Sequence, residues 1–355
     1  MRTTLSILLA TLSLAACEQK GGGPVAKPSE GATPTPGANA GGEMILQGAG
    51  ATFPYPLYSK WMAEYQKVRP DVKINYQSIG SGGGIKQITE RTVDFGATDA
   101  PMKPEEAAKA PGKIVHVPTT IGAVVLAYNL PGVSNLKLTP EIVAGIYLGE
   151  ITKWNDKKVA EANPGVKLPG DAITVAYRSD GSGTTAVFTE YLASVSPTWK
   201  EKVGAGKSVK FPVGLGAKGN EGVSGQVKTT PGTIGYVELA YAKQTNLMVA
   251  SLKNQSGAFV DPTIESISAA AEGVVLSDDL TASIVNSPNP KAYPIASFTY
   301  LLVYEDMQDD AKAKGLQGFM QWALHDGQAL GPPLHYAPLP AAVVQKIDAR
   351  VATLK

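Results

Sequence analysis

The chain has 355 residues, of which 43% are apolar, 18% charged and 7% aromatic, a globular composition with room for about two domains. Lysine and arginine total 32 against 31 aspartates and glutamates, so the net charge is +1 and the basic excess typical of nucleic-acid-binding proteins is absent. A single cysteine excludes a disulfide framework and a zinc site built on several cysteines.

The first residues, MRTTLSILLATLSLAAC, have the pattern of a targeting signal. Arg2 precedes an apolar stretch from Leu5 to Leu14 that is too short to span the ~30 Å hydrocarbon core of a bilayer. Small residues then lead directly to Cys17, as in a bacterial lipoprotein signal. We therefore expect residues 1–16 to be removed and Cys17 to be lipidated; an ordinary signal peptide with an incidental cysteine is the alternative. Without residues 1–16 the net charge is 0.

Residues 17–43 are predicted to form a disordered tether. Eleven of the 22 residues from 21 to 42 are Gly or Pro, and such a segment buries too little apolar surface to fold. The folded body is expected to begin near Met44 and to lie outside the cytoplasm, where ATP and NAD are not available.

Strand-like and helix-like segments alternate along the body. Such alternation favours an α/β fold with mainly parallel sheets flanked by helices. Apolar spacing and β-branched runs predict strands at 44–47, 73–78, 93–97, 114–118, 123–128, 172–177 and 297–304. Helices are predicted at 54–65, 85–91, 139–148, 186–195, 316–325 and 341–353.

Three loops rich in Gly, Ser and Thr stand between a predicted strand and a helix, at 48–54, 80–84 and 178–184. The first N–H groups of a helix lack partners and the helix dipole is positive there, so such a loop suits an anion. Glycine permits close approach, and Ser or Thr adds a hydroxyl donor. For any one loop, plain N-capping is the alternative.

Two charged residues indicate which anion fits. The planar fork of Arg178 suits an oxyanion, and Asp180 can brace it. Asp99, at the end of another strand, repels a fully ionised ligand but can accept a hydrogen bond from one that keeps a proton. Phosphate keeps a proton near neutral pH and sulfate does not, so Asp99 would select phosphate. A turn or cap role for Asp99 is the alternative.

Other motifs are incomplete. The segment 204–208 ends like a P-loop, but the required glycine is replaced by Glu201. The segment 214–219 fits the short G-x-G-x-x-G pattern, a weak signal for a dinucleotide outside the cytoplasm. The three histidines lack metal-ligand spacing, and no base stands near Ser182 to activate it. No cofactor, metal or catalytic residue is therefore expected.

Four segments have a distinctive sequence: GAGATFP (48–54), YQSIGSGGG (76–84), VDFGATDAP (93–101) and RSDGSGTT (178–185). In these motifs, and over about 44–350, the sequence resembles the phosphate-binding protein of phosphate ABC transporters. It implies a two-lobed periplasmic binding protein of type II with the ligand in the cleft between the lobes. Lobe one is expected at 44–122 plus 298–355 and lobe two at 123–297, with crossings near Gly122 and Ser297.

The resemblance also implies the phosphate contacts. Asp180 matches the residue that orients the basic contact, Arg178. The other expected contacts are hydroxyls, backbone N–H groups and the proton-accepting carboxylate, at Thr52, Phe53, Ser81, Asp99, Ser182, Gly183 and Thr184.

The expected function is therefore high-affinity binding of inorganic phosphate and its delivery to the permease subunits of an ABC importer. The protein is expected to be a non-enzymatic monomer in the periplasm or cell envelope, anchored through Cys17, with no nucleic-acid partner. A binding protein for another oxyanion such as sulfate is the alternative, followed by a secreted phosphate-ester hydrolase. The hydrolase would need a metal cluster or an activated nucleophile.

Overall fold

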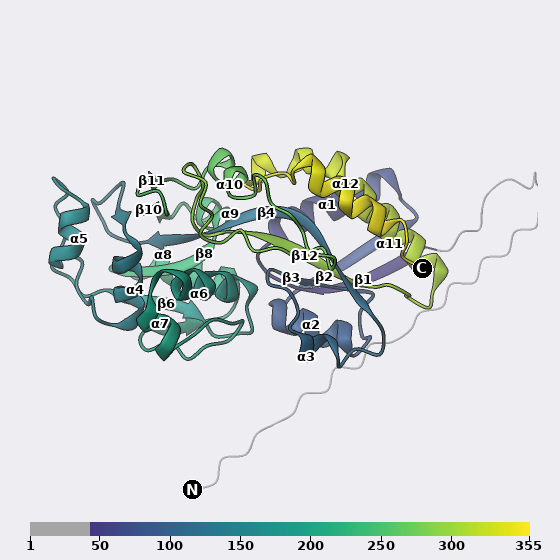
Figure 1. The fold of residues 1–355 in the computed structure, drawn as a ribbon, viewed down its shortest axis with the longest axis horizontal. Helices are drawn as coiled ribbons and strands as arrows, with labels where there is room; N and C mark the ends of the chain where they lie inside the picture. The colour runs from purple at the N-terminus through teal and green to yellow at the C-terminus, as the bar shows by residue number, and fades with distance from the viewer. Residues whose placement is uncertain (1–42) are drawn as a thin grey trace, which may run out of the picture. The chain divides into compact units, whose positions relative to one another are not determined.

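The structure is a computed structural model, and it describes residues 43–355. The predicted signal peptide, Cys17 and residues 18–42 of the predicted tether lie outside the described residues. Helices and strands alternate along the rest of the chain (Figure 1). The strands are β1 (Met44–Gly50), β2 (Val72–Ser78), β3 (Phe95–Thr98), β4 (Ile114–Tyr128), β5 (Lys137–Leu138), β6 (Thr174–Arg178), β7 (Leu215–Ala217), β8 (Thr233–Glu238), β9 (Met248–Val249), β10 (Ser251–Lys253), β11 (Phe259–Val260) and β12 (Ala296–Tyr304).

The helices cover most of the predicted ones and add several short ones. They are α1 (Tyr55–Val68), α2 (Ser81–Thr89), α3 (Pro104–Ala107), α4 (Pro140–Leu148), α5 (Lys157–Ala162), α6 (Gly183–Val195), α7 (Pro197–Lys202), α8 (Gly219–Thr229), α9 (Leu239–Gln244), α10 (Ile264–Ala270), α11 (Asp310–Leu324) and α12 (Ala341–Val351), with the 3-10 helices η1 (Asp326–Leu330) and η2 (Pro332–Leu334).

The main sheet is mixed. Its strand order is β2-β1-β3-β12-β4-β8-β6-β7, with β9 paired to β4, and a small second sheet has the order β11-β10-β5. β1 is parallel to β2 and β3, and β6 is parallel to β7 and β8. Parallel pairing thus holds within each of these two groups, whereas β4 and β12 between them pair antiparallel with each other.

β4 and β12 connect the two parallel groups. Figure 1 shows them between the end that carries α1, α2 and α11 and the end that carries α4, α6 and α8. β4 is one continuous strand over 114–128, where the sequence predicted two. Its first part pairs with β12 and its second part with β8. Gly122 and Ser297, the expected crossing points, are register partners.

Two helices begin within the glycine-rich loops instead of after them. α2 begins at Ser81 and α6 at Gly183, several residues earlier than predicted, so the loop residues form the first helical turns. At Gly122 the Phe53 ring takes the place that a side chain would fill, since a Cβ there would lie 2.4 Å from the ring.

Three buried tryptophans, well separated in the sequence, pack in the core. Trp61 donates to the carbonyl of Gly327 at 2.7 Å, and Trp154 donates to the carbonyl of Gly232 at 3.0 Å. Trp199 is also fully buried. Within 43–355, every helix is too short or too polar to cross a membrane.

Candidate functional site

The turns that follow parallel strands bring the predicted site residues together. β1 is parallel to β2 and β3, with Gly50 in register with both Ser78 and Ala97. The turns before α1 and α2 and the residue Asp99 therefore meet at one edge of the sheet. β6 is parallel to β7 in the same way, so the turns before α6 and α8 also meet.

Ser81 joins the second loop to the third. Its Oγ accepts hydrogen bonds from the backbone N–H of Gly183 at 3.0 Å and of Asp99 at 3.3 Å, and it lies 3.4 Å from Asp99 Oδ2. The N–H of Gly82 donates to the carbonyl of Gly181 at 2.9 Å. The loops before α2 and α6, far apart in the sequence, are therefore in direct contact.

Asp99 is a buried carboxyl group that titrates near neutral pH. It is 2% exposed, and Thr299 on β12 donates from Oγ1 to its Oδ1 at 2.8 Å. Burial raises the pKa of Asp99 to about 7, although the hydrogen bond from Thr299 and the charge of Arg178 act in the opposite direction. Asp99 can therefore accept a proton from a ligand, or hold one itself, in the range where phosphate also titrates.

Arg178 supplies the cation. Its side chain is 1% exposed and forms a two-point pair with Asp180, from Nε to Oδ1 at 2.8 Å and from Nη2 to Oδ2 at 2.5 Å. Burial acts to raise the pKa of Asp180, but the Arg178 partner holds that pKa below its ordinary value. The N–H of Gly219 adds a third bond to Asp180, at 3.0 Å. The pair fixes the orientation of the guanidinium, and Nη1 of Arg178 donates to Thr184 Oγ1 at 3.3 Å.

Three tyrosine hydroxyls hold the backbone of the first loop. Tyr76, Tyr241 and Tyr336 donate to the successive carbonyls of residues 51, 52 and 53, at 2.7, 2.5 and 2.7 Å. Within 43–355, no hydrogen bond occupies the backbone N–H of Phe53. The carbonyl groups of residues 51–53 are therefore satisfied inside the protein, and among the described residues the N–H of Phe53 remains available to an acceptor.

The third loop forms the first turn of α6. Ser182 caps this helix, since its Oγ accepts from the N–H of Thr185 at 3.0 Å, and its own N–H donates to the carbonyl of Lys207 at 2.8 Å. The N–H of Gly183 is already bonded to the second loop. The N–H of Thr184 has no partner among the described residues, so the positive end of α6 presents a free donor.

Asn220, at the start of α8, is a site residue that the sequence analysis missed. It is fully buried, and its Nδ2 donates to Thr52 Oγ1 at 2.7 Å and to Thr184 Oγ1 at 3.2 Å. It therefore links the first loop to the third. A signal was present, because 214–219 is another glycine-rich segment between a strand and a helix, but the sequence analysis considered it only as a dinucleotide motif.

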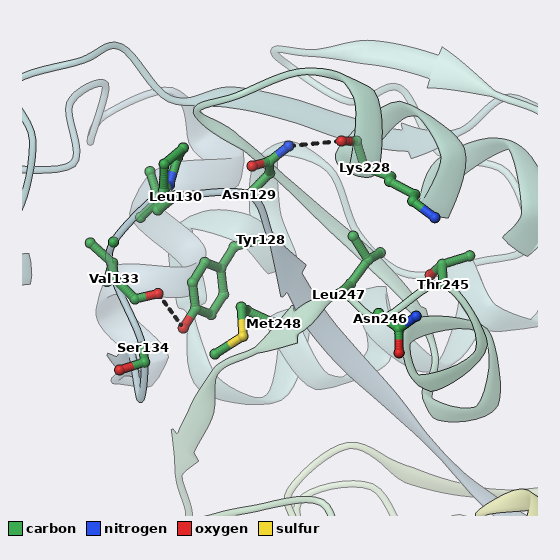
Figure 2. A pocket seen from close by; sticks show the side chains of 12 residues that line it. Tyr128, Asn129, Leu130, Val133, Ser134, Lys228, Thr245, Asn246, Leu247 and Met248 are labelled. Carbon is green, nitrogen blue, oxygen red and sulfur yellow. Dashed lines mark hydrogen bonds between the residues drawn. The ribbon is translucent and has the colours of Figure 1, made fainter.

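A surface hollow of about 660 Å³ lies elsewhere, between the end of β4 and the turn after α9 (Figure 2). Asn129 donates from Nδ2 to the carbonyl of Lys228 at 2.9 Å, and the Tyr128 hydroxyl donates to the carbonyl of Val133 at 3.5 Å. None of the predicted ligand contacts lines this hollow.

The fold and the converging groups define a class of protein. Buried hydroxyls, helix-start N–H groups and one braced arginine surround a carboxyl that titrates near neutral pH. This combination suits a binding protein that encloses a small oxyanion bearing a proton.

Comparison with known proteins identifies the family. The model of the PBP superfamily domain matches residues 28–326. The phosphate-binding protein PstS of Pasteurella multocida is 45% identical over 312 residues, which cover 87% of this chain and 90% of that protein. PstS of Xylella fastidiosa, strain Temecula1, is 42% identical over 352 residues, covering 98% and 96%.

A solved structure supports the same fold. The ABC-type phosphate transport receptor from Vibrio cholerae superposes with a TM-score of 0.56 at 18% identity, covering 83% of this chain and 100% of that one. The chain belongs to the PstS family of phosphate-binding proteins. The predicted α/β fold, that of a type II periplasmic binding protein, is confirmed.

Proposed function

We propose that the protein binds inorganic phosphate with high affinity outside the cytoplasm and delivers it to an ABC importer. It is a binding protein, not an enzyme. One observation supports phosphate above other oxyanions: Asp99 is buried, has a pKa of about 7 and lies in the same site as the Arg178 cation. A ligand that shares a proton with this carboxyl is stabilised, and a ligand without one meets an unpaired negative charge.

The proposed contacts divide by chemistry. Asp99 accepts the phosphate proton, and Arg178, held by Asp180, supplies the cation among these contacts. The remaining contacts are uncharged donors, at Thr52, Phe53, Ser81, Ser182, Gly183 and Thr184. The N–H of Gly183 would donate to phosphate in place of its bond to Ser81 Oγ. Since the Arg178–Asp180 pair is neutral as a whole, the phosphate charge is stabilised mainly by N–H and O–H dipoles.

We assign residues 44–122 and 298–355 to lobe one and residues 123–297 to lobe two, joined where β4 and β12 cross. Under this division, several contacts join the lobes. They include the Gly82–Gly181 hydrogen bond and the ion pair of Lys207 with Glu106, whose Nζ and Oε2 lie 2.9 Å apart. Phosphate bound between the lobes would shift the protein toward this closed arrangement, which the membrane permease would recognise.

The N-terminal residues would keep the protein at the membrane. We propose that Cys17 is lipidated after removal of residues 1–16 and that the chain acts as a monomer on a tether in the cell envelope. Two or more acyl chains hold a protein stably on a bilayer, whereas one holds it weakly.

Calorimetric titration at pH 7 tests the proposed function. Tight binding of phosphate with sulfate bound far more weakly is the expected result. Equal affinities would favour a general oxyanion receptor, and absence of phosphate binding would overturn the proposal.

A further inference from the structure

Two hydroxyls in the site, those of Thr52 and Thr184, have no acceptor for their hydrogens. Both side chains are buried, at 3% and 0% exposure. Within 43–355 each hydroxyl oxygen takes part only as an acceptor, and neither O–H donates to a protein group. A buried donor without an acceptor is rare in folded proteins and points to a missing partner.

The donors to these oxygens centre on Asn220. Thr52 Oγ1 accepts from Asn220 Nδ2 at 2.7 Å and from the Asn220 backbone N–H at 3.4 Å. Thr184 Oγ1 accepts from Asn220 Nδ2 at 3.2 Å and from Arg178 Nη1 at 3.3 Å. A hydroxyl oxygen has two lone pairs and one hydrogen. Since both lone pairs are taken on each oxygen, each hydroxyl can only donate to a ligand.

The orientation of the Asn220 amide is fixed from its other side. Its Oδ1 accepts from the backbone N–H of Glu238 at 2.8 Å. A backbone N–H can only donate, so the amide oxygen faces Glu238 and the NH2 group faces the two threonines. The backbone at the end of β8 therefore determines which way the threonine hydrogens point.

We propose that Asn220 is a positioning residue that fixes Thr52 and Thr184 as donors and thereby makes this side of the site specific for unprotonated oxygens. This inference rests on the proposed function. Asn220 and Asp99 together give the site two chemically different sides. The side of Asp99 accepts the ligand proton, and the side of Thr52 and Thr184 requires unprotonated ligand oxygens. The ligand proton then has one favourable direction, toward Asp99.

Asn220→Asp tests the inference because it keeps the shape of the side chain and reverses the hydrogen bonds. One carboxylate oxygen still accepts from Glu238, and the other now accepts from Thr52 and Thr184, which turns their hydrogens away from the ligand. Phosphate affinity should fall by about 100-fold or more, since each hydrogen bond to a charged group contributes on the order of tenfold. Asn220→Ala removes the amide without reversing the hydroxyls and should lose only about tenfold.

Asn220→Asp also adds a negative charge, and the effect of this charge on phosphate affinity must be separated from the effect of the reversed hydroxyls. A double-mutant cycle does this, with Asn220→Asp measured in the wild-type background and in Thr52→Val/Thr184→Val. If Asn220 acts through the hydroxyls, the Asn220→Asp penalty shrinks several-fold when they are absent. An equal penalty in both backgrounds, or a larger loss for Asn220→Ala than for Asn220→Asp, would overturn the inference.

The pH provides a second readout. The Asn220→Asp penalty, taken as a ratio to wild type at each pH, should decrease toward pH 5 as the new carboxyl gains a proton. A structural defect would not recover in this way. Asn129→Asp, at the hollow of Figure 2, is the matched control and should leave phosphate affinity unchanged. Wild-type protein that binds no phosphate would refute the proposed function itself, whereas tight wild-type binding with an unaffected Asn220→Asp variant would refute only this inference.

Discussion

Replacing Asp99 by asparagine should relax the choice between phosphate and sulfate. Thr299 donates to Oδ1 at 2.8 Å, so the new amide oxygen keeps that position and the NH2 group replaces Oδ2 near Ser81. The side of the carboxyl that faces the site then donates a hydrogen bond where it previously accepted one. Sulfate, which has acceptors only, gains a partner and loses a repelling charge.

The magnitude follows from the charge that is removed. Two unit charges about 4 Å apart interact by about 4 kcal/mol at an effective dielectric of about 20. Relief of this repulsion corresponds to roughly a 1,000-fold gain in sulfate affinity at a pH where Asp99 is ionised. Phosphate loses the acceptor for its proton, so the phosphate affinity of Asp99→Asn should be about tenfold lower than that of wild type.

The sulfate affinity of the wild-type protein should also depend on pH, through the protonation of Asp99. The pKa of Asp99 is about 7 because the group is buried, so the carboxyl is ionised at pH 8 and protonated at pH 5.5. Protonated Asp99 can donate to sulfate just as asparagine does. Sulfate affinity of the wild-type protein should therefore rise as the pH falls through 7, and that of Asp99→Asn should stay level.

The assay is calorimetric titration of both proteins with sulfate and phosphate at pH 8 and pH 5.5. Asp171→Asn, at an exposed aspartate, is the charge-matched control and should behave like wild type. The reasoning fails if Asp99→Asn rejects sulfate at pH 8 as strongly as wild type does. It also fails if wild-type sulfate affinity is the same at both pH values.

Three further changes test separate parts of the site. Arg178→Met should weaken phosphate binding at least about 30-fold in titrations, since truncating one partner of a buried charge pair costs about 2–5 kcal/mol. Tyr336→Phe removes the hydroxyl bonded to the Phe53 carbonyl, so urea unfolding should show a loss of about 1–3 kcal/mol and phosphate binding should weaken. Gly183→Ala would place a methyl group 2.4 Å from Asp99 Oδ2 and should abolish phosphate binding in titrations.

Each of these changes has a matched control. Tyr304→Phe also removes a buried hydroxyl, bonded to the Ile88 carbonyl at 2.7 Å, and should lower stability without changing phosphate affinity. Gly225→Ala meets no atom within 4 Å, and Arg69→Met breaks only an exposed ion pair; both should bind like wild type. Equal loss of phosphate affinity in a variant and its control would contradict the assigned role.

Local patterns in the sequence predicted three parts of the candidate site. Each glycine-rich loop between a strand and a helix was predicted from residue types alone, and the structure brings the three loops together. Asp99 could be placed at a strand end, and the parallel pairing of β1 with β3 explains why it reaches the same edge. Arg178 and Asp180 stand two residues apart, so their pairing was also local.

Long-range contacts account for what the sequence analysis did not find. Tyr241 and Tyr336 contact the loop at 52–53 from far along the chain, and their apolar rings resemble ordinary core residues. Asn220 lies just after β7, a strand of only three residues with no apolar alternation. Only the pairing of β7 with β6 brings Asn220 to the site.

The helix starts and the crossing strand were misplaced for a related reason. Glycine and serine lower intrinsic helix propensity, so α2 and α6 were predicted to begin after their loops. Contacts between the loops, such as those of Ser81 with Gly183, accompany helical turns there. β4 continues through Pro118 because β12 pairs with it along this stretch, which local propensity does not reveal.

A crystal structure of the protein grown with phosphate at pH 7.5 tests the central claim most directly. We predict a phosphate ion between the loop before α1 and the first turns of α2 and α6, with one of its oxygens about 2.5–2.7 Å from Asp99, the length of a hydrogen bond to a charged oxygen. The hydroxyls of Thr52 and Thr184 should contact other oxygens of the same ion. A phosphate ion bound away from Asp99, or found in the hollow of Figure 2 instead, would contradict the account.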